Sequence, residues 1–294
     1  MAISAALVKE LRERTGVGMM ECKKFLQQTN GDIEEAIAEM RKAGAAKVAK
    51  KDGRVTAEGL VAVAVSSDRK LAAIIEANCE TDFVCRNEDF MGFAQLCADQ
   101  AIAHRCADVD SLSNAPSNHG DLNIDQYRQQ LIVKIGENIN LRRVTLIQAT
   151  GEVSHYLHGA RIGVLIDVVS GNDELGKDLA MHVAASNPVV VAGKDVPQEL
   201  LDKEKEIYSA QAAESGKPAD IIEKMIQGRL NKFLEEVSLE GQSFVKDPEQ
   251  KVAALLKAAG AKVASFIRYE VGEGIEKKQE NFADEVMAQV RGTN

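Results

Sequence analysis

The sequence predicts an α+β protein in which helices and antiparallel strands occupy separate stretches of the chain. Apolar residues recur at helical spacing from residue 4 to about residue 44, whereas from Glu58 the apolar period is two, as in β-strands. The order strand, strand, loop, helix that follows Glu58 recurs in weaker form at 154–187, which indicates an internal duplication. A length of 294 residues is typical of about two domains, and a hydrophobic fraction of 45% is sufficient for a folded core.

Residues 1–54 are predicted to form an N-terminal module of three short helices followed by a basic linker. Ser4 is placed to cap the first helix, and Gly16 to end it in a left-handed conformation. Asp32 is placed to cap the third helix, with Glu35 three residues later as in a capping box. The second helix has a predicted inner face of three residues: Met19, Cys22 and Leu26.

The linker is assigned to 43–55, where alanine and lysine alternate without an apolar face. Its basic side chains are expected to be solvated and not to bind RNA, because no aromatic residues lie between them for base stacking. They are Lys47, Lys50, Lys51 and Arg54.

The first core subdomain is assigned to 55–150. Two β-type runs, at 59–67 and 70–79, predict a hairpin, and a helix with an apolar face follows the loop that begins at Thr81. The second subdomain is assigned to 151–196, continued by 238–275. Since a lone strand cannot satisfy its backbone, the extended run at 262–271 must pair with a sheet formed earlier in the chain.

Between the two parts of the second subdomain, the stretch 197–237 contains two helical segments joined by the letters SGKP. Each segment has enough apolar positions for one seam but too few to be surrounded by a core. We therefore predict an antiparallel coiled-coil hairpin that projects from the body. The sequence leaves open whether this arm contacts a partner or a second copy of the chain in a homodimer.

The charge distribution argues against broad nucleic-acid binding. The chain carries a formal charge of −9, with 36 basic and 45 acidic residues. Residues 1–54 contain 11 basic and 8 acidic side chains and so carry +3, which leaves −12 on the remainder. Nucleic acid is therefore not expected as a partner. There is no membrane-length apolar stretch and no signal-peptide pattern at residue 1, so a cytoplasmic location is expected.

Catalytic signatures are absent from the sequence. None of the patterns GxxxxGK[ST], GxGxxG, HExxH and GxSxG occurs, so no enzyme activity, small-molecule substrate or cofactor is predicted. His155 and His158 lie three apart on a predicted strand and face opposite sides, and His182 is distant in sequence, so no metal site is expected. The 5 cysteines have no ligand spacing and are interpreted as reduced, mostly buried thiols.

The loop Thr81-Asp82-Phe83-Val84 allows two interpretations. In one, Thr81 or Asp82 caps the following helix and Phe83 packs inward. In the other, Phe83 is an exposed anchor that enters a pocket of a partner protein, with Asp82 acting on polar groups there. The pattern of residues does not separate the two.

Six long stretches resemble the bacterial elongation factor Ts family, in the same order over nearly the whole chain. They are LVKELRERTGVGMMECKK with NGDIEEAI in the first 54 residues, NCETDFV at 78–84, KIGENINLRR at 134–143, HGARIGVL at 158–165, AMHVAASNP at 180–188 and FIRYEVGEGIEKK at 266–278. The stretch 107–125 does not share the resemblance.

The resemblance implies a guanine-nucleotide exchange factor that binds elongation factor Tu in its GDP-bound and nucleotide-free forms. It implies a ubiquitin-associated-like N-terminal module, a core of two subdomains, a coiled-coil arm and a short C-terminal helical module at 276–294. It also implies three sets of partner-binding residues. Those that disturb the magnesium site of the GTPase are Thr81, Asp82, Phe83 and Val84. Those of the core contact are Ile135, Gly136 and His158. Those of the N-terminal module are Arg12, Met19 and Met20.

Two other classes of function remain as alternatives. One is an adaptor that binds proteins or RNA through the N-terminal helical module, and the other is an α+β enzyme with an unrecognised site. Phe83 discriminates the exchange factor from the adaptor, because only the exchange mechanism depends on it.

Overall fold

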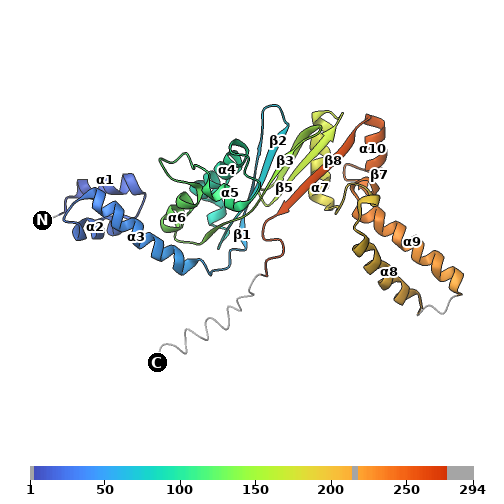
Figure 1. Ribbon diagram of the computed structural model, residues 1–294, viewed down its shortest axis with the longest axis horizontal. Helices are drawn as coiled ribbons and strands as arrows, with labels where there is room; N and C mark the ends of the chain where they lie inside the picture. Colours follow the sequence, from blue (N-terminus) through green and yellow to red (C-terminus); the bar gives the residue numbers. More distant parts are fainter. Residues whose placement is uncertain (1–2, 214–217, 277–294) are drawn as a thin grey trace, which may run out of the picture.

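The structure is a computed structural model that describes residues 3–213 and 218–276 (Figure 1). The C-terminal helical module expected at 276–294 lies, beyond Glu276, outside the described residues. Helices and antiparallel sheets occupy separate layers, so the predicted α+β class is confirmed. A three-helix module stands at one end of the molecule, two sheets lie in the middle and a helical arm projects at the other end (Figure 1).

The N-terminal module consists of three helices: α1 (Ala5–Thr15), α2 (Met19–Gln28) and α3 (Ile33–Lys51). Ser4 accepts the backbone N–H of Leu7 and caps α1, and Gly16 ends it with φ of 67°. Asp32 caps α3 by accepting the backbone N–H of Glu35 at 2.9 Å, as predicted. Side chains of all three helices share a small apolar core.

Two predictions for this module are wrong. Helix α3 continues to Lys51, through most of the predicted linker, because it packs along another helix of the core. A Cβ on Gly44 would lie 3.2 Å from Val133 of that helix, which shows how closely the two approach. Met19 is 56% exposed, and Phe25 is buried beside Cys22 in its place.

The first sheet has the order β1-β2-β3 and is antiparallel throughout. Its strands are β1 (Glu58–Val65), β2 (Leu71–Cys79) and β3 (Ile139–Gln148), of which β3 was not predicted. Three helices accompany this sheet: α4 (Glu88–Ala103), α5 (Val109–Asn114) and α6 (Ile124–Ile135). Helix α4 packs on β1 and β2 and closes the largest apolar core. The unassigned stretch 107–125 forms α5, a tight loop and the start of α6, and it contributes Leu112 and Ile124 to that core.

The second sheet repeats this order as β4-β5-β8. Its strands are β4 (Glu152–His158), β5 (Ile162–Val169) and β8 (Lys262–Glu270). Helix α7 (Asp173–Ser186) packs on β4 and β5 as α4 packs on β1 and β2. In both halves the second strand is central and one helix covers it, which agrees with the predicted duplication. The late strand β8 pairs with β5, as predicted.

The two sheets pack against each other across an apolar layer. Val61 and Ile74 from the first sheet and Leu165 from the second are buried there. The two sheets approach closely at Gly163 of β5, where a Cβ would lie 2.4 Å from Val61 Cγ1. Only glycine fits at this position without displacement of Val61.

The arm is formed by α8 (Gln198–Ala213) and α9 (Ala219–Val237), which lie side by side and project from the second half (Figure 1). Arg229 of α9 lies over the ring of Tyr208 of α8, with 5.6 Å between its Cζ and the ring centroid. The chain returns to the body through three short elements: β6 (Ser243–Phe244), β7 (Asp247–Lys251) and α10 (Val252–Ala259).

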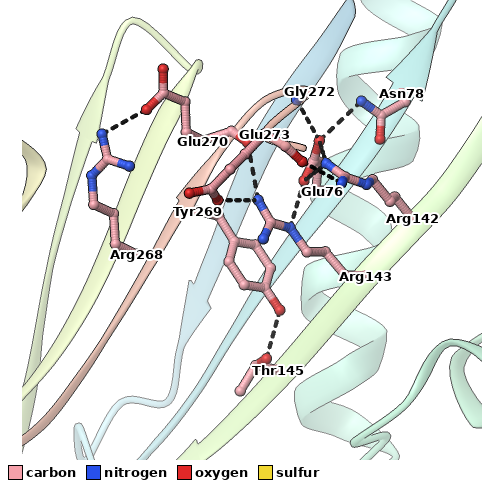
Figure 2. Close-up of polar contacts among 10 residues, drawn as sticks. All are labelled: Glu76, Asn78, Arg142, Arg143, Thr145, Arg268, Tyr269, Glu270, Gly272 and Glu273. Carbon is pink, nitrogen blue, oxygen red and sulfur yellow. Dashed lines mark hydrogen bonds and ion pairs between the residues drawn. The ribbon is translucent and has the colours of Figure 1, made fainter. Parts of the chain in front are cut away.

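A buried carboxylate links the two halves (Figure 2). Glu76 of β2 is fully buried and accepts hydrogen bonds from Arg143 Nε at 2.6 Å, from Arg142 at 3.0 Å and from the Gly272 N–H at 2.8 Å. Burial disfavours the ionised form, but the bonds from Gly272, Asn78 and the two arginines outweigh it and hold the pKa of Glu76 below its usual range. The segment that leaves β8 is thereby fixed to the first sheet.

Candidate functional site

The loop after β2 presents Phe83 to solvent. The Phe83 side chain is 81% exposed, whereas its neighbour Val84 is buried in the first core. The helix that follows is capped by Asn87, whose side chain accepts the backbone N–H groups of Asp89 and Phe90. The interpretation in which Thr81 or Asp82 caps this helix and Phe83 packs inward is therefore wrong. Asn87 supplies the cap, and Val84 supplies the apolar contact.

The loop is held in place by two carboxylates. Thr81 donates to Glu137 twice, from its backbone N–H at 2.9 Å and from its hydroxyl at 2.6 Å. Glu80 accepts the backbone N–H of Asn138 at 2.6 Å and pairs with Arg54 at 3.3 Å. The loop is thus fixed both to the segment that enters β3 and to the chain that follows α3.

Ile135 and Gly136 lie next to the residues that hold the Phe83 loop in place, which we call the frame of the loop. Gly136 ends α6 with φ of 92°, its N–H donates to Ile132 O at 3.0 Å, and its carbonyl accepts from the Lys51 ammonium. Ile135 is half-buried against the first core, and Gly136 is exposed. Because Glu137 follows directly and holds Thr81, the structure brings Ile135 and Gly136 beside the Phe83 loop.

His158 ends β4, in the other sheet, yet it lies at the same end of the body. Its exposed ring has Nδ1 3.2 Å from the hydroxyl of Tyr156. Arg161, which follows in the same turn, pairs with Glu58 at 2.7 Å, and Glu58 is the register partner of Cys79, just before the Phe83 loop. His158 is therefore connected to the loop through the Arg161–Glu58 ion pair and the strand pairing of Glu58 with Cys79.

The three residues of the N-terminal module are all exposed. Met20 is 81% exposed, Met19 is 56% exposed and Arg12 lies in the last turn of α1. Between them is Gly16, where a Cβ would lie 3.4 Å from the side chain of Lys134, the residue before Ile135. The turn between α1 and α2 therefore reaches the end of α6, close to the core residues described above.

The residues that build the frame were not found by sequence analysis, which gave Lys51 and Arg54 only as solvated linker residues. The sequence gives little indication of them, because each is an ordinary polar residue whose partner lies far away in the chain. They are Lys51, Arg54, Glu80, Glu137 and Asn138.

The chemistry of the site suits contact with another protein. An apolar ring and a carboxylate, those of Phe83 and Asp82, stand side by side and exposed on a fixed backbone. The histidines do not converge, since His182 is fully buried and bonds to Gln242 at 2.9 Å. Across the described part of the chain, no group of three or more His, Cys, Asp or Glu side chains is arranged to hold a metal ion. Within the same residues, every helix is too short or too polar to cross a bilayer.

Comparison with known proteins gives consistent results. The family model described as Elongation factor TS matches residues 80–273, which is more than half of the chain. Elongation factor Ts of Legionella pneumophila (strain Paris) is 58% identical over 289 residues, which cover 98% of this chain and 99% of the relative. Elongation factor Ts of Thioalkalivibrio sulfidiphilus is 56% identical over 294 residues, covering 99% and 100%. That of Coxiella burnetii (strain Dugway 5J108-111) is 54% identical over 291 residues, covering 99% and 98%. The chain belongs to the elongation factor Ts family.

Proposed function

We propose that this protein is the guanine-nucleotide exchange factor of elongation factor Tu. It binds the GDP-bound GTPase, promotes release of GDP and stabilises the nucleotide-free form until GTP binds. Membership of the elongation factor Ts family implies this role. The observation that carries the proposal is the 81% exposed ring of Phe83, held on a loop whose backbone is fixed by Glu137 and Glu80.

In the proposed mechanism, Asp82 and Phe83 enter the GTPase beside its magnesium ion. Magnesium in a GTPase is held by few protein ligands together with phosphate oxygens and water, and it demands near-ideal octahedral geometry. A small displacement of one ligand therefore strongly weakens binding of the magnesium ion. Loss of the ion leaves the charge of the diphosphate uncompensated, and GDP departs.

The remaining candidate residues supply binding that does not depend on the ion. Ile135, Gly136 and His158 line the contact made by the core, and the exposed turn of the N-terminal module adds Met19 and Met20, together with Arg12. Since these contacts persist in the empty GTPase, they keep the factor bound after GDP has left, whereas the preference for the empty form comes from the Phe83 loop. The arm formed by α8 and α9 lies at the far end of the molecule (Figure 1), where it is free to contact another part of the GTPase or a second copy of this chain.

Exchange of this kind is a linkage effect and needs no covalent chemistry. If the factor binds the empty GTPase better than the loaded one, nucleotide must weaken binding of the factor by the same ratio. A thousandfold reciprocal effect corresponds to about 4 kcal/mol of coupling, at about 1.4 kcal/mol per decade. One buried aromatic ring with several polar contacts is sufficient for this magnitude.

The test is the release of labelled GDP from purified elongation factor Tu, measured by stopped flow over a range of magnesium concentrations. We expect Phe83→Ala to slow stimulated release at least tenfold while thermal unfolding of the factor is unchanged. Val245→Ala is the matched control, because Val245 is also exposed and lies in the turn between β6 and β7, in the other half of the molecule. Stimulation that is independent of Phe83 would contradict the role of the loop, and GDP that fails to dissociate the complex would contradict the exchange function itself.

The adaptor remains the second candidate, favoured by the exposed Met19 and Met20. Removal of residues 1–54 is a poor test, since it also removes Lys51 and Arg54 from the frame of the loop. The paired substitution Met19→Ala with Met20→Ala leaves the frame intact. An exchange factor then keeps part of its binding to elongation factor Tu through the core, whereas an adaptor loses partner binding altogether.

A further inference from the structure

Two cysteines bracket the loop that carries Phe83. Cys79 is the last residue of β2, and Cys85 lies in the single 3-10 turn that follows the loop. Their sulfur atoms are 3.5 Å apart, and both thiols are free. Each sulfur is also close to the carbonyl oxygen of Thr81, at 3.1 Å from Cys79 and 3.7 Å from Cys85. The six-residue separation therefore places two thiols in contact directly beneath the loop.

The two thiols have different environments. Cys79 is fully buried, whereas Cys85 is partly exposed. The hydrogen bond with Cys79 lowers the pKa of the Cys85 thiol, assisted by the Gly59 N–H and the charge of Arg161 and opposed by partial burial and the charge of Glu58. The hydrogen bond to Cys85 and burial raise the pKa of the Cys79 thiol. Cys85 is therefore the sulfur that a reagent in solvent can reach, and Cys79 is the buried neighbour in contact with it.

We propose that Cys79 and Cys85 are a thiol pair that a hydroperoxide converts into a reversible disulfide across the Phe83 loop. The proposal stands on the contact between the sulfurs and on the difference in their exposure. A partly exposed thiolate beside a second thiol is the usual arrangement of a peroxide-sensitive cysteine and its resolving partner. The other three cysteines, Cys22, Cys97 and Cys106, are buried.

The reaction balances with one molecule of hydrogen peroxide. The Cys85 thiolate attacks one peroxide oxygen, the O–O bond breaks, and the departing hydroxide takes a proton and leaves as water. The resulting sulfenic acid on Cys85 is attacked by the sulfur of Cys79, the S–S bond forms and the S–O bond breaks. The second hydroxide takes the proton of Cys79 and leaves as water. Each sulfur is oxidised by one electron, and the peroxide is reduced by two.

The disulfide would change the loop. Both sulfurs must move from 3.5 Å to bonding distance, about 2 Å, and neither then keeps a hydrogen atom to share with the other sulfur or with the Thr81 carbonyl. The segment that the disulfide closes into a covalent loop contains Asp82 and Phe83. This consequence rests on the proposed function, and in that setting we expect the oxidised factor to stimulate GDP release several-fold less than the reduced one.

The site itself is tested without any GTPase. Trypsin cleaves after Lys70 and after Arg86, so a single peptide, residues 71–86, holds Cys79 and Cys85 and none of the other cysteines. The full chain is treated with hydrogen peroxide, denatured, alkylated, digested and analysed by mass spectrometry. We expect this peptide to lose two hydrogen atoms and to escape alkylation at both cysteines, and dithiothreitol to restore alkylation. The peptide that carries Cys97, residues 87–105, serves as the internal control and remains alkylated.

Two outcomes would overturn the proposal. One is a peptide that remains alkylated at both cysteines. The other is Cys85 that advances to sulfinic acid while Cys79 is still alkylated. Cys85→Ala, at a partly exposed position, is the matched variant, and its Cys79 is expected to stay alkylated after peroxide. If the disulfide forms and dithiothreitol-reversible inhibition of exchange is absent, the link to exchange is wrong although the site exists. If reduced protein stimulates no exchange at all, the proposed function fails and the thiol pair stands.

Discussion

The hydroxyl of Thr81 donates a 2.6 Å hydrogen bond to Glu137, a residue 56 positions later in the chain. The other carboxylate oxygen accepts the Thr81 backbone N–H at 2.9 Å. One side chain beyond α6 thus fixes both the backbone and the side chain of the residue that precedes Asp82. The position of Phe83 is therefore determined by the first sheet as a whole, because Glu137 stands at the entry to β3.

Replacement of Glu137 is expected to weaken exchange without removing any residue of the proposed contact. Glu137→Ala leaves two donors of Thr81 unpaired, which costs about 1–3 kcal/mol of the free energy of unfolding. Stimulated GDP release should fall several-fold, since Phe83 is no longer held. Urea unfolding and stopped-flow release measure the two effects.

The matched control is Glu249→Ala, at an exposed glutamate of β7 outside the proposed contacts. If Glu137→Ala loses stability while release stays unchanged, the frame is structural only.

Glu76 is expected to be among the most sensitive positions of the fold. Glu76→Ala leaves the buried ends of Arg142 and Arg143 and the Gly272 N–H without their acceptor. Removal of one partner of a buried ion pair costs about 3–5 kcal/mol. Chemical denaturation at neutral pH measures the loss. Glu76→Gln keeps the shape and one acceptor oxygen and should lose less, and equal losses would show that the negative charge opposite Arg142 and Arg143 is what matters there.

The stability of the protein is expected to fall in mild acid because of His182. Its Nδ1 accepts the Val245 N–H at 3.1 Å, so its Nε2 carries the proton and donates to Gln242, and the ring is neutral. Burial lowers the pKa of His182, partly opposed by the bond to Gln242. The unfolded chain takes up a proton near pH 6.5, whereas the folded chain does so only at lower pH. The free energy of unfolding should therefore decrease below about pH 6.5, by at most about 1.4 kcal/mol per pH unit.

Urea titrations between pH 7.5 and 5 measure this slope. Partial desolvation of the His155 ring, at an exposed position, also lowers its pKa, with the charges of Lys177 and Arg69 acting in the same direction, so the comparison is made in a His155→Gln background. A pH-independent stability in that background would contradict the neutral, buried state of His182.

Two glycine substitutions should have opposite effects on the stability of the fold. Gly163→Ala places a Cβ 2.4 Å from Val61 Cγ1, and overpacking of this kind costs about 1–3 kcal/mol. Gly228→Ala, in α9 with open space around it, should stabilise by up to about 1 kcal/mol through helix propensity. Thermal unfolding distinguishes them. Adding Val61→Ala to Gly163→Ala should restore part of the loss, and failure to do so would place the strain in the backbone.

Local patterns predicted most of the elements. The caps at Ser4 and Asp32 and the hairpin of β1 and β2 follow from nearby residues, and the structure confirms them. Strand β3 was missed, and its arginine pair at 142–143 finds its partner only when Glu76 lies opposite. The length of α3 was underestimated because the surface on which it packs, at Val133, comes from α6.

The candidate site was harder to predict than the fold. Whether Phe83 points inward or outward depends on which residue caps α4, and Thr81, Asp82 and Asn87 are all suitable N-caps. The frame requires pairs such as Thr81 with Glu137, which no local period reveals. The resemblance supplied the candidate site residues, and the structure places the candidates of the core near one another.

The continuous helix α3 has a thermodynamic consequence. If a flexible linker joined the module to the core, each binding event would have to order that linker, and the lost conformational entropy would weaken binding. Here Lys51 and Gly44 fix the helix to α6 before any encounter, so that ordering is completed once, during folding. The exposed methionines at the start of α2 are therefore carried on a module whose position relative to the first subdomain is set by α3 before any complex forms.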